Sequence, residues 1–325
     1  MKNLRNYIGY AVSLVVVLVI VFTFDWRTVA AELRSFNYLY LLPALALYVT
    51  GFVFRGFRWQ CMLAPIKLIG FMSSFSVVMI GFMANNILPL RMGEFVRAWA
   101  IKKKEGISGT AGFATIIVER VYDGLTLVGL FVFVLLFSAT SSEVKRYACL
   151  GAPIFLCAFG MLLYAAFRPD SASRLIKRAT KILPRKLHAR ADGMVDSFMP
   201  GLHFLSSGKR QAVVIFYSVL IWFIEGCVFW CIMRGFNLDA PAYAAFFTLV
   251  IVNIAIMVPA MPGYVGTFDL PAVAALAPFG VGKDAAIGYI IVVHALQYVS
   301  VTALGLYYMN ASGWSLREIE EVKKA

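Results

Sequence analysis

The 325-residue sequence has few charged residues: 14% are Asp, Glu, Lys or Arg, whereas 61% are hydrophobic. Soluble globular domains have about 25% charged and about 45–50% apolar residues. A chain with so little charge cannot bury its apolar side chains in one globular core, so most of them must face lipid or other membrane helices. We therefore expect an all-α polytopic membrane protein that forms a single integral membrane domain, residues 1–325.

The sequence also lacks the motifs of metal, disulfide and nucleotide sites. No Cys-x-x-Cys pair occurs. The segment Gly280-Val-Gly282-Lys283 lacks the spacing of a phosphate-binding P-loop. We expect no cofactor and no metal, and we interpret the cysteines as small apolar residues in or beside apolar runs: Cys61, Cys149, Cys157, Cys227 and Cys231.

Long apolar runs dominate what is present. Six are read as full membrane spans: residues 7–24, 37–54, 122–140, 147–167, 211–233 and 285–309. Two others, residues 71–89 and 243–262, end in prolines and glycines and continue directly into polar motifs. We predict that these two are re-entrant helical hairpins, which enter and leave the membrane on the same side.

The placement of the basic residues supports this topology. The net charge is +13, but most Lys and Arg residues lie in short connections between apolar runs, as the positive-inside rule describes, so nucleic acid is not an expected partner. If the N-terminus is cytoplasmic, the second span returns to the cytoplasm at Arg55 and Arg58. The basic run that ends at Lys104 stays cytoplasmic only if residues 71–89 do not cross. This predicts a bacterial-type inner (plasma) membrane protein with both termini cytoplasmic.

The two hairpin segments resemble each other. Each ends in the pattern Pro-x-x-x-Gly-x-Phe, from Pro89 through Gly93 and from Pro262 through Gly266. Short segments broken by Gly and Pro at matching points of two halves indicate an inverted-repeat transporter with its site between the repeats. We predict an N-terminal half (1–167), a basic cytoplasmic linker (168–210) and a C-terminal half (211–325). The residues expected to break the helices and form a gate are Pro89, Gly93, Pro259, Pro262, Gly263 and Gly266.

The first polar cluster follows residues 71–89. Arg91, Glu94 and Arg97 are spaced by three, so a helix places them on one face, just after Asn85 and Asn86. Two guanidinium groups fixed by a carboxylate suit bidentate binding of a phosphate. The alternative is an interfacial helix whose arginines simply reach toward water.

The second polar cluster lies within an apolar run. Glu119, Arg120 and Asp123 are costly inside a membrane and normally face the bundle interior or a cavity. They form either an ion-pair network that locks helices together or part of a substrate site. Glu225 and His294 lie in the fifth and last spans, where a carboxylate and a histidine are candidates for a proton relay. For His294, a satisfied structural histidine is the alternative.

These motifs together resemble the lysylphosphatidylglycerol synthase/flippase transmembrane family. The resemblance rests on the motif from Asn85-Asn86 to Arg97, on Glu119-Arg120-x-x-Asp123, and on Pro262-Gly263-x-x-Gly266-x-Phe268. It covers nearly the whole chain. It implies a two-half membrane fold with re-entrant helices and, in the best-understood members, translocation of aminoacylated phosphatidylglycerol. Other members are linked to hopanoid and lipid-linked sugar pathways, so the resemblance does not identify the lipid.

The sequence thus predicts a flippase that moves an anionic, phosphate-bearing lipid between leaflets of the membrane. The candidates are a phospholipid, an aminoacyl-phospholipid and a polyprenyl-phosphate-linked lipid. Arg91 and Arg97, oriented by Glu94, would receive the phosphate, Arg120 would pass it inward, and residues 259–268 would gate the other side.

Two alternatives remain open. One is a membrane transferase that acts on a lipid-linked donor or headgroup and depends on Glu119 or Asp123. The other is a non-catalytic membrane partner of a separately encoded lipid-modifying enzyme. Family members that attach lysine to lipid carry a large soluble domain after the membrane part. This chain ends at Ala325, and we expect that it does not make an aminoacyl lipid by itself.

Overall fold

A computed structural model describes residues 26–88, 92–137, 157, 160–161, 164, 167–168, 170–174, 185–256, 264 and 266–321. All regular elements in this described part are helices, which confirms the predicted all-α membrane fold. The predicted span at residues 7–24 and most of the span at 147–167 lie outside it. The number of full spans therefore stays a prediction.

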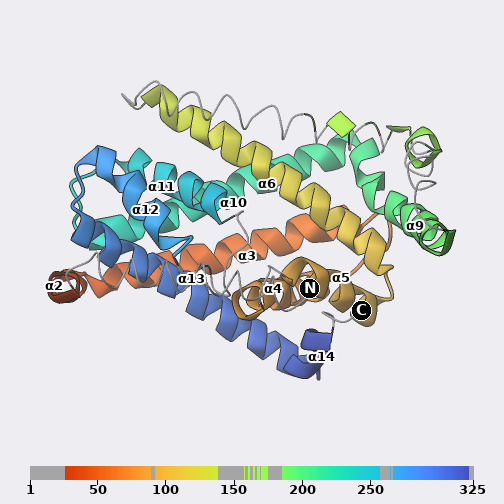
Figure 1. The fold of residues 1–325 in the computed structure, drawn as a ribbon, viewed down its shortest axis with the longest axis horizontal. Coiled ribbons are helices and arrows are strands. Elements are labelled where there is room, and N and C mark those ends of the chain that lie inside the picture. Colours follow the sequence, from red (N-terminus) through yellow and green to blue (C-terminus); the bar gives the residue numbers. More distant parts are fainter. Residues whose placement is uncertain are drawn as a thin grey trace.

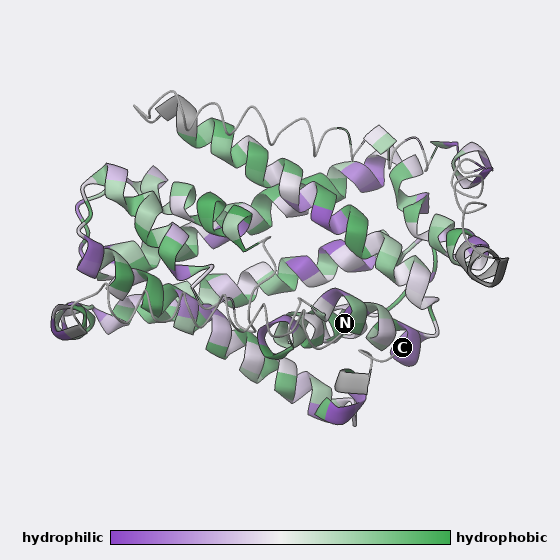
Figure 2. Cartoon of the chain, viewed as in Figure 1, coloured by the Kyte–Doolittle hydropathy of each residue, from purple (hydrophilic) through white to green (hydrophobic). Residues whose placement is uncertain are grey.

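Long apolar helices form the body of the protein. Among the described residues, three segments are long and apolar enough to cross a membrane: Tyr38–Leu63, α10 (Gly208–Gly235) and α13 (Lys283–Ala311). The first of these consists of the short helix η1 (Tyr38–Tyr40) followed by α3 (Leu41–Leu63). A fourth long helix, α6 (Gly109–Phe137), carries Glu119, Arg120 and Asp123. All four run along the long axis of the molecule, with α6 and α13 on opposite edges (Figure 1). Hydrophobic residues predominate along these helices (Figure 2), as expected of helices that contact lipid.

Each predicted hairpin segment forms a short helix that packs against a second short helix. The pairs are α4 (Phe71–Ile87) with α5 (Gly93–Glu105), and α11 (Ala242–Ala255) with α12 (Asp269–Leu276), which continues as η5 (Ala277–Phe279). All four are shorter than the roughly 20 residues that a full crossing needs. The inverted relation of the two halves stays a prediction.

Glycines bring α4 and α5 together. A Cβ atom on Gly93 would lie 2.1 Å from the carbonyl oxygen of Gly81, so only glycine allows this approach. Asn85 stabilises the same junction, because its Oδ1 accepts a 2.7 Å hydrogen bond from the backbone N–H of Gly93 at the start of α5. Asn86 ties α4 to α13 through a 3.0 Å hydrogen bond from its Nδ2 to Thr302.

The predicted end of the second span is wrong. The sequence placed Arg55 and Arg58 in a cytoplasmic connection, but α3 continues to Leu63, and these residues are only 5% and 0% exposed. The helix keeps both arginines inside because carboxylates from α6 and α10 neutralise them. The basic residues beyond α3 still gather at one end, where Lys67 pairs with Glu105 at 2.9 Å and Lys103 with Glu318 at 2.7 Å.

The remaining elements cover the two ends of the bundle. They are α2 (Trp26–Ser35) at one end, and α9 (Arg185–Phe198), η3 (Met199–Ser206) and α14 (Leu316–Glu321) at the other (Figure 1). Of the predicted cytoplasmic linker, residues 185–206 form α9 and η3, which pack on α6. The four cysteines in the described part are free thiols, and Cys149 lies outside it.

Candidate functional site

Charged and amide side chains meet halfway along the four long helices. Asp123 and Gln297 stand at the middle of α6 and α13, and Arg55 and Glu225 lie within one turn of the middle of α3 and α10. Ionisable groups at this depth are costly and usually mark a functional site or a buried ion pair. The geometry separates them into a locked cluster and a cavity.

The locked cluster joins α3, α5 and α6. Arg97 places two guanidinium nitrogens 3.0 and 2.9 Å from the two oxygens of Glu119, and its guanidinium lies 4.3 Å from the centre of the Trp59 ring. Arg58 contacts Asp123 at 2.6 Å and Glu119 at 3.3 Å. Because Arg58, Arg97, Glu119 and Asp123 are all at most 4% exposed, their main effect is to fix the relative positions of the helices.

Two residues of α10 complete this cluster. Ser218 on α10 accepts a 2.8 Å hydrogen bond from Arg58, and the indole N–H of Trp222 donates a 3.0 Å bond to Asp123. The carboxylate of Asp123 is therefore surrounded by donors from α3 and α10 as well as from its own helix. A carboxylate whose lone pairs are occupied by these donors is not available as a base.

Arg120 connects the locked cluster to the cavity. One of its nitrogens lies 2.9 Å from Glu119 and another 3.5 Å from Asp123. Unlike Arg58 and Arg97, its side chain is 33% exposed and lines a cavity. A guanidinium at this depth that is only partly covered can bind an additional anion.

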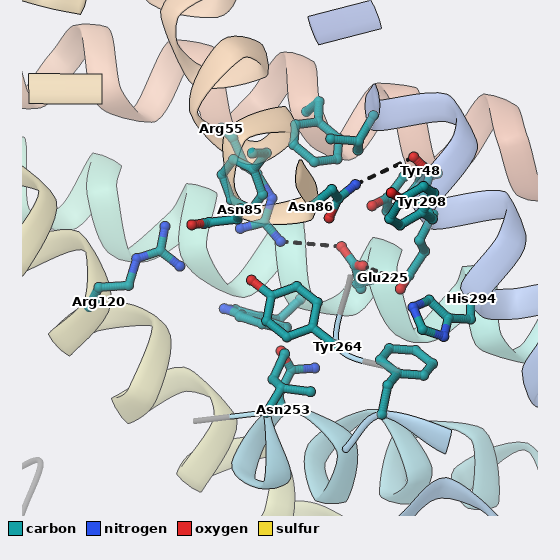
Figure 3. Close-up of a pocket in the computed structure, with 17 residues that line it drawn as sticks. Tyr48, Arg55, Asn85, Asn86, Arg120, Glu225, Asn253, Tyr264, His294 and Tyr298 are labelled. Atoms are coloured by element: carbon teal, nitrogen blue, oxygen red, sulfur yellow. Dashed lines mark hydrogen bonds and ion pairs between the residues drawn. The ribbon is translucent and has the colours of Figure 1, made fainter. Parts of the chain in front are cut away.

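The cavity has a volume of about 120 Å³ and lies between both hairpins and the four long helices (Figure 3). Its walls combine arginines, a carboxylate, amides and aromatic rings. The lining residues are Tyr48, Phe52, Arg55, Phe82, Asn85, Asn86, Arg120, Trp222, Glu225, Asn253, Ile256, Tyr264, Phe268, His294, Gln297, Tyr298 and Val301.

The ion pair in the cavity wall is Arg55 with Glu225. Their contact is a single 3.2 Å hydrogen bond from Arg55 to Oε2 of Glu225, and Gln297 donates a 2.9 Å bond to Oε1. Three aromatic rings, of Phe52, Phe82 and Trp222, surround the Arg55 guanidinium at 5.3–5.6 Å. Their faces stabilise the cation independently of Glu225.

The second hairpin contributes the opposite wall. Nδ1 of His294 on α13 lies 3.0 Å from Asp269, whose other oxygen accepts a 2.8 Å hydrogen bond from the N–H of Gly266. Phe268 stacks on His294 with ring centres 4.5 Å apart. Tyr264 adopts a positive φ of 57° and points into the cavity between Arg120 and His294 (Figure 3). These contacts attach the start of α12 to α13.

The arginines of the site have donors that their carboxylates do not use. Arg55, Arg58, Arg97 and Arg120 form ion pairs with three described carboxylates, those of Glu119, Asp123 and Glu225. The Nε–H groups of the four arginines are buried without a hydrogen-bond partner among the described residues. A cavity with unsatisfied cationic donors is suited to an anion.

The predicted site residues are distributed over both parts. Asn85, Asn86, Arg120, Glu225 and His294 line the cavity, whereas Glu119 and Asp123 belong to the locked cluster. Arg97 belongs there too, and its engagement with Glu119 does not fit direct phosphate binding. Glu94 is partly buried on α5, and Gly93 and Gly266 lie at the hairpin junctions. The other predicted residues, Arg91, Pro89, Pro259, Pro262 and Gly263, lie outside the described residues.

Sequence reasoning missed Arg55 as a site residue, and with it Tyr48, Trp222, Tyr264 and Gln297. A usable signal was present in the balance of charges. Glu119, Asp123 and Glu225 are three carboxylates in apolar runs, and Arg120 alone cannot neutralise them. Arg55 and Arg58 follow an apolar run and lie one turn apart on the same helix face, so they were candidates to neutralise the remaining carboxylates.

Known proteins resemble this chain over nearly its full length. Residues 6–305 match the family described as the lysylphosphatidylglycerol synthase TM region. A UPF0104 membrane protein from Methanothermobacter thermautotrophicus is 23% identical over 322 residues, which cover 95% of this chain and 94% of the relative. A UPF0104 membrane protein from Methanocaldococcus jannaschii is 21% identical over 322 residues, which cover 95% of each.

Another relative is longer than this chain. Glycosyltransferase AglD from Haloferax volcanii is 26% identical over 301 residues, which cover 81% of this chain but 47% of that protein. No solved structure matches the chain significantly.

Proposed function

The chain belongs to the lysylphosphatidylglycerol synthase transmembrane-region family, and from this premise we propose that it moves an anionic, phosphate-bearing lipid between the leaflets of its membrane. The observation that supports this proposal most directly is the cavity halfway along the long helices, with Arg55 and Arg120 in its wall. Both arginines have a buried Nε–H without a partner in the described part of the chain. They are the proposed ligands of the lipid phosphate.

The locked cluster has a supporting role in this proposal. Arg58 and Arg97 hold Glu119 and Asp123, and those two carboxylates orient Arg120 through contacts of 2.9 and 3.5 Å. Fixing one side of a guanidinium leaves its other edge preorganised for a phosphate. We therefore revise the predicted path of the lipid. Arg97 holds a carboxylate of the locked cluster in position, and Arg55 takes the role of phosphate ligand that the sequence had suggested for Arg97.

A lipid fits this site better than a small soluble anion. In the cavity wall, the side chain of Arg120 is one-third exposed on a helix that is otherwise strongly apolar. A headgroup could bind there while its acyl chains stay in the bilayer beside hydrophobic side chains such as Val132 and Phe133, which are 45% and 56% exposed. The two hairpins, which flank the cavity, would open it alternately toward each side.

The test is leaflet transfer in proteoliposomes that contain nitrobenzoxadiazole-labelled phosphatidylglycerol. Dithionite bleaches only the label in the outer leaflet, so transfer appears as loss of the protected fraction. Arg120→Gln should slow transfer about 10- to 100-fold, because a charge-assisted hydrogen bond contributes about 1.5–3 kcal/mol. Arg234→Gln is the matched control, since Arg234 is exposed at the end of α10, away from the cavity.

Two results would refute this assignment. Wild-type transfer no faster than in protein-free liposomes would favour the alternative of a non-catalytic partner for a separate lipid-modifying enzyme. Unchanged transfer by a folded Arg120→Gln variant would remove the arginine from the mechanism.

A transferase is a second candidate because one relative is named a glycosyltransferase. The acidic residues on which that hypothesis depends, Glu119 and Asp123, are both held by arginines. Neither carboxylate is free to act as a base, and we therefore favour transport. Turnover of a radiolabelled lipid-linked sugar by the purified protein would reverse this preference.

A further inference from the structure

We infer that Glu225 is a displaceable partner of Arg55, so that each anionic headgroup entering the cavity is accompanied by one proton that binds Glu225. This inference rests on the proposed function, because it assumes that an anion binds at Arg55. It goes further by making transport of the anion proton-coupled. It depends on four features of the Arg55–Glu225 pair.

First, this pair is held by fewer ion-pair contacts than the arginines and carboxylates of the locked cluster. Arg97 binds Glu119 through two bonds of 2.9 and 3.0 Å, and Arg58 approaches Asp123 to 2.6 Å. Arg55 has one bond of 3.2 Å to Glu225. Among the described ion pairs, this one alone has both members in the cavity wall, so an entering anion meets it directly.

Second, Arg55 does not need Glu225 in order to stay in place. Its guanidinium is surrounded by the rings of Phe52, Phe82 and Trp222, which attract a cation through their faces. It is 5% exposed, and its Nε–H has no partner in the described structure. An anion can therefore replace the carboxylate at an arginine that is already held in position.

Third, the neighbours of Glu225 suit its neutral form as well as its charged form. Gln297 donates to Oε1, and this bond persists if Oε2 carries a proton, because Oε1 is then the carbonyl oxygen. The bond from Arg55 goes to Oε2 and is the one that protonation removes. The two oxygens are thus divided between a neutral donor and a charged donor.

Fourth, the other charged groups around Glu225 are already paired or carry the wrong charge to replace Arg55. Titratable groups face it from every side: Tyr48 and Arg55 on α3, Arg120 and Asp123 on α6, His294 on α13 and Tyr264 in the second hairpin. Arg120 contacts Glu119 and Asp123, and His294 contacts Asp269. Once an anion occupies Arg55, an ionised Glu225 would be an uncompensated charge in an apolar setting, which is strongly unfavourable.

The exchange balances in charge and in atoms. The monoanionic phosphate diester binds Arg55 and the contact from Arg55 to Oε2 breaks. A hydronium ion of the solvent transfers its proton to Oε2 of Glu225, which forms an O–H bond there and leaves water. One negative charge and one positive charge enter together, so the net charge of the cavity does not change. Release of the lipid reverses each step and returns the proton to water.

The experiment measures proton uptake during binding of dioctanoyl phosphatidylglycerol to the purified full-length protein in detergent. Isothermal titration calorimetry in two buffers of different ionisation enthalpy gives the number of protons directly. We expect uptake of about one proton per lipid near pH 7, with an affinity that rises about tenfold per pH unit of acidification. Glu225→Gln should bind the lipid with no uptake and no dependence on pH.

His294→Gln distinguishes the two titratable groups of the cavity. We expect its proton uptake to match the wild type. Retained uptake in Glu225→Gln, combined with loss in His294→Gln, would assign the proton to His294 and overturn the inference.

The wild-type measurement alone can also overturn the inference, even if Glu225→Gln does not fold. Binding without proton uptake, and with a flat pH profile, would show that Glu225 stays with Arg55. The proposed function would survive that result, because the lipid would still bind. Absence of any lipid binding to the wild type would instead count against the proposed function.

Discussion

Removal of the Glu119 charge is the sharpest test of the locked cluster. Its carboxylate receives two contacts from Arg97, at 3.0 and 2.9 Å, one from Arg58 at 3.3 Å and one from Arg120 at 2.9 Å. Glu119→Gln keeps the shape but removes the carboxylate that Arg97 contacts and leaves Arg58 and Arg120 with Asp123. Breaking a buried ion pair costs about 3–5 kcal/mol, and we expect a loss in the upper part of that range because three arginines are affected.

The measurement is the free energy of unfolding in bicelles by steric trapping, with Arg120→Gln as the comparison. Arg120 touches the same carboxylates but is one-third exposed, so its loss should destabilise the protein by about 1–2 kcal/mol while lipid transfer falls. Glu119→Gln should therefore lower mainly the free energy of unfolding, whereas Arg120→Gln should lower mainly lipid transfer. A Glu119→Gln variant as stable as the wild type would refute the view that this cluster holds α3, α5 and α6 together.

Two other predictions concern the hairpin formed by α4 and α5. Gly93→Ala should destabilise the protein by about 1–3 kcal/mol in the same unfolding assay, because its Cβ would lie 2.1 Å from the carbonyl oxygen of Gly81, whereas Gly129→Ala, with open space around it, should not. Hydrogen bonds from Ser73 and then Lys67 hold the pKa of Glu105 below its usual value. The contribution of the Glu105 carboxylate to stability should therefore be present above about pH 4 and lost as the pH falls further. Glu105→Gln should be less stable than the wild type by about 0.5–1 kcal/mol at neutral pH and equal to it in acid.

Membrane residence and helix type could be predicted from the sequence because they depend on composition and on the length of apolar runs. The short helices α4 and α11 were also foreseeable, since prolines and glycines follow each run directly. Glu119, Arg120 and Asp123 were recognised as a group because they lie close together in the chain.

Contacts between distant helices could not be predicted in the same way. Arg55 and Glu225 are 170 positions apart, and nothing local in the sequence shows that they pair. Arg55 and Arg58 were assigned to water because an arginine after an apolar run normally marks the membrane surface. Their burial depends on carboxylates from other helices, and it becomes visible only when the helices are assembled.

The different roles of Arg97 and Arg120 also depend on contacts between distant helices. Arg97 and Arg120 both have sequence neighbours that suggest anion binding, yet one is 2% exposed beneath Trp59 and the other lines the cavity. The sequence showed that both arginines lie in or beside apolar runs. Which of the two faces an open space is decided by the packing of α5 against α4 and α6, which places Arg97 on the Trp59 ring of α3.

The position of the cavity halfway along the helices has an electrical consequence. A charge that moves through the whole membrane potential changes its energy by about 2.3 kcal/mol per 100 mV, so an anion that reaches the cavity from either face senses about half of this, roughly 1.2 kcal/mol. A headgroup that binds alone would therefore be drawn to one side by the voltage. A headgroup that arrives with a proton would carry no net charge across, and its movement would be electrically silent and driven by the pH difference instead.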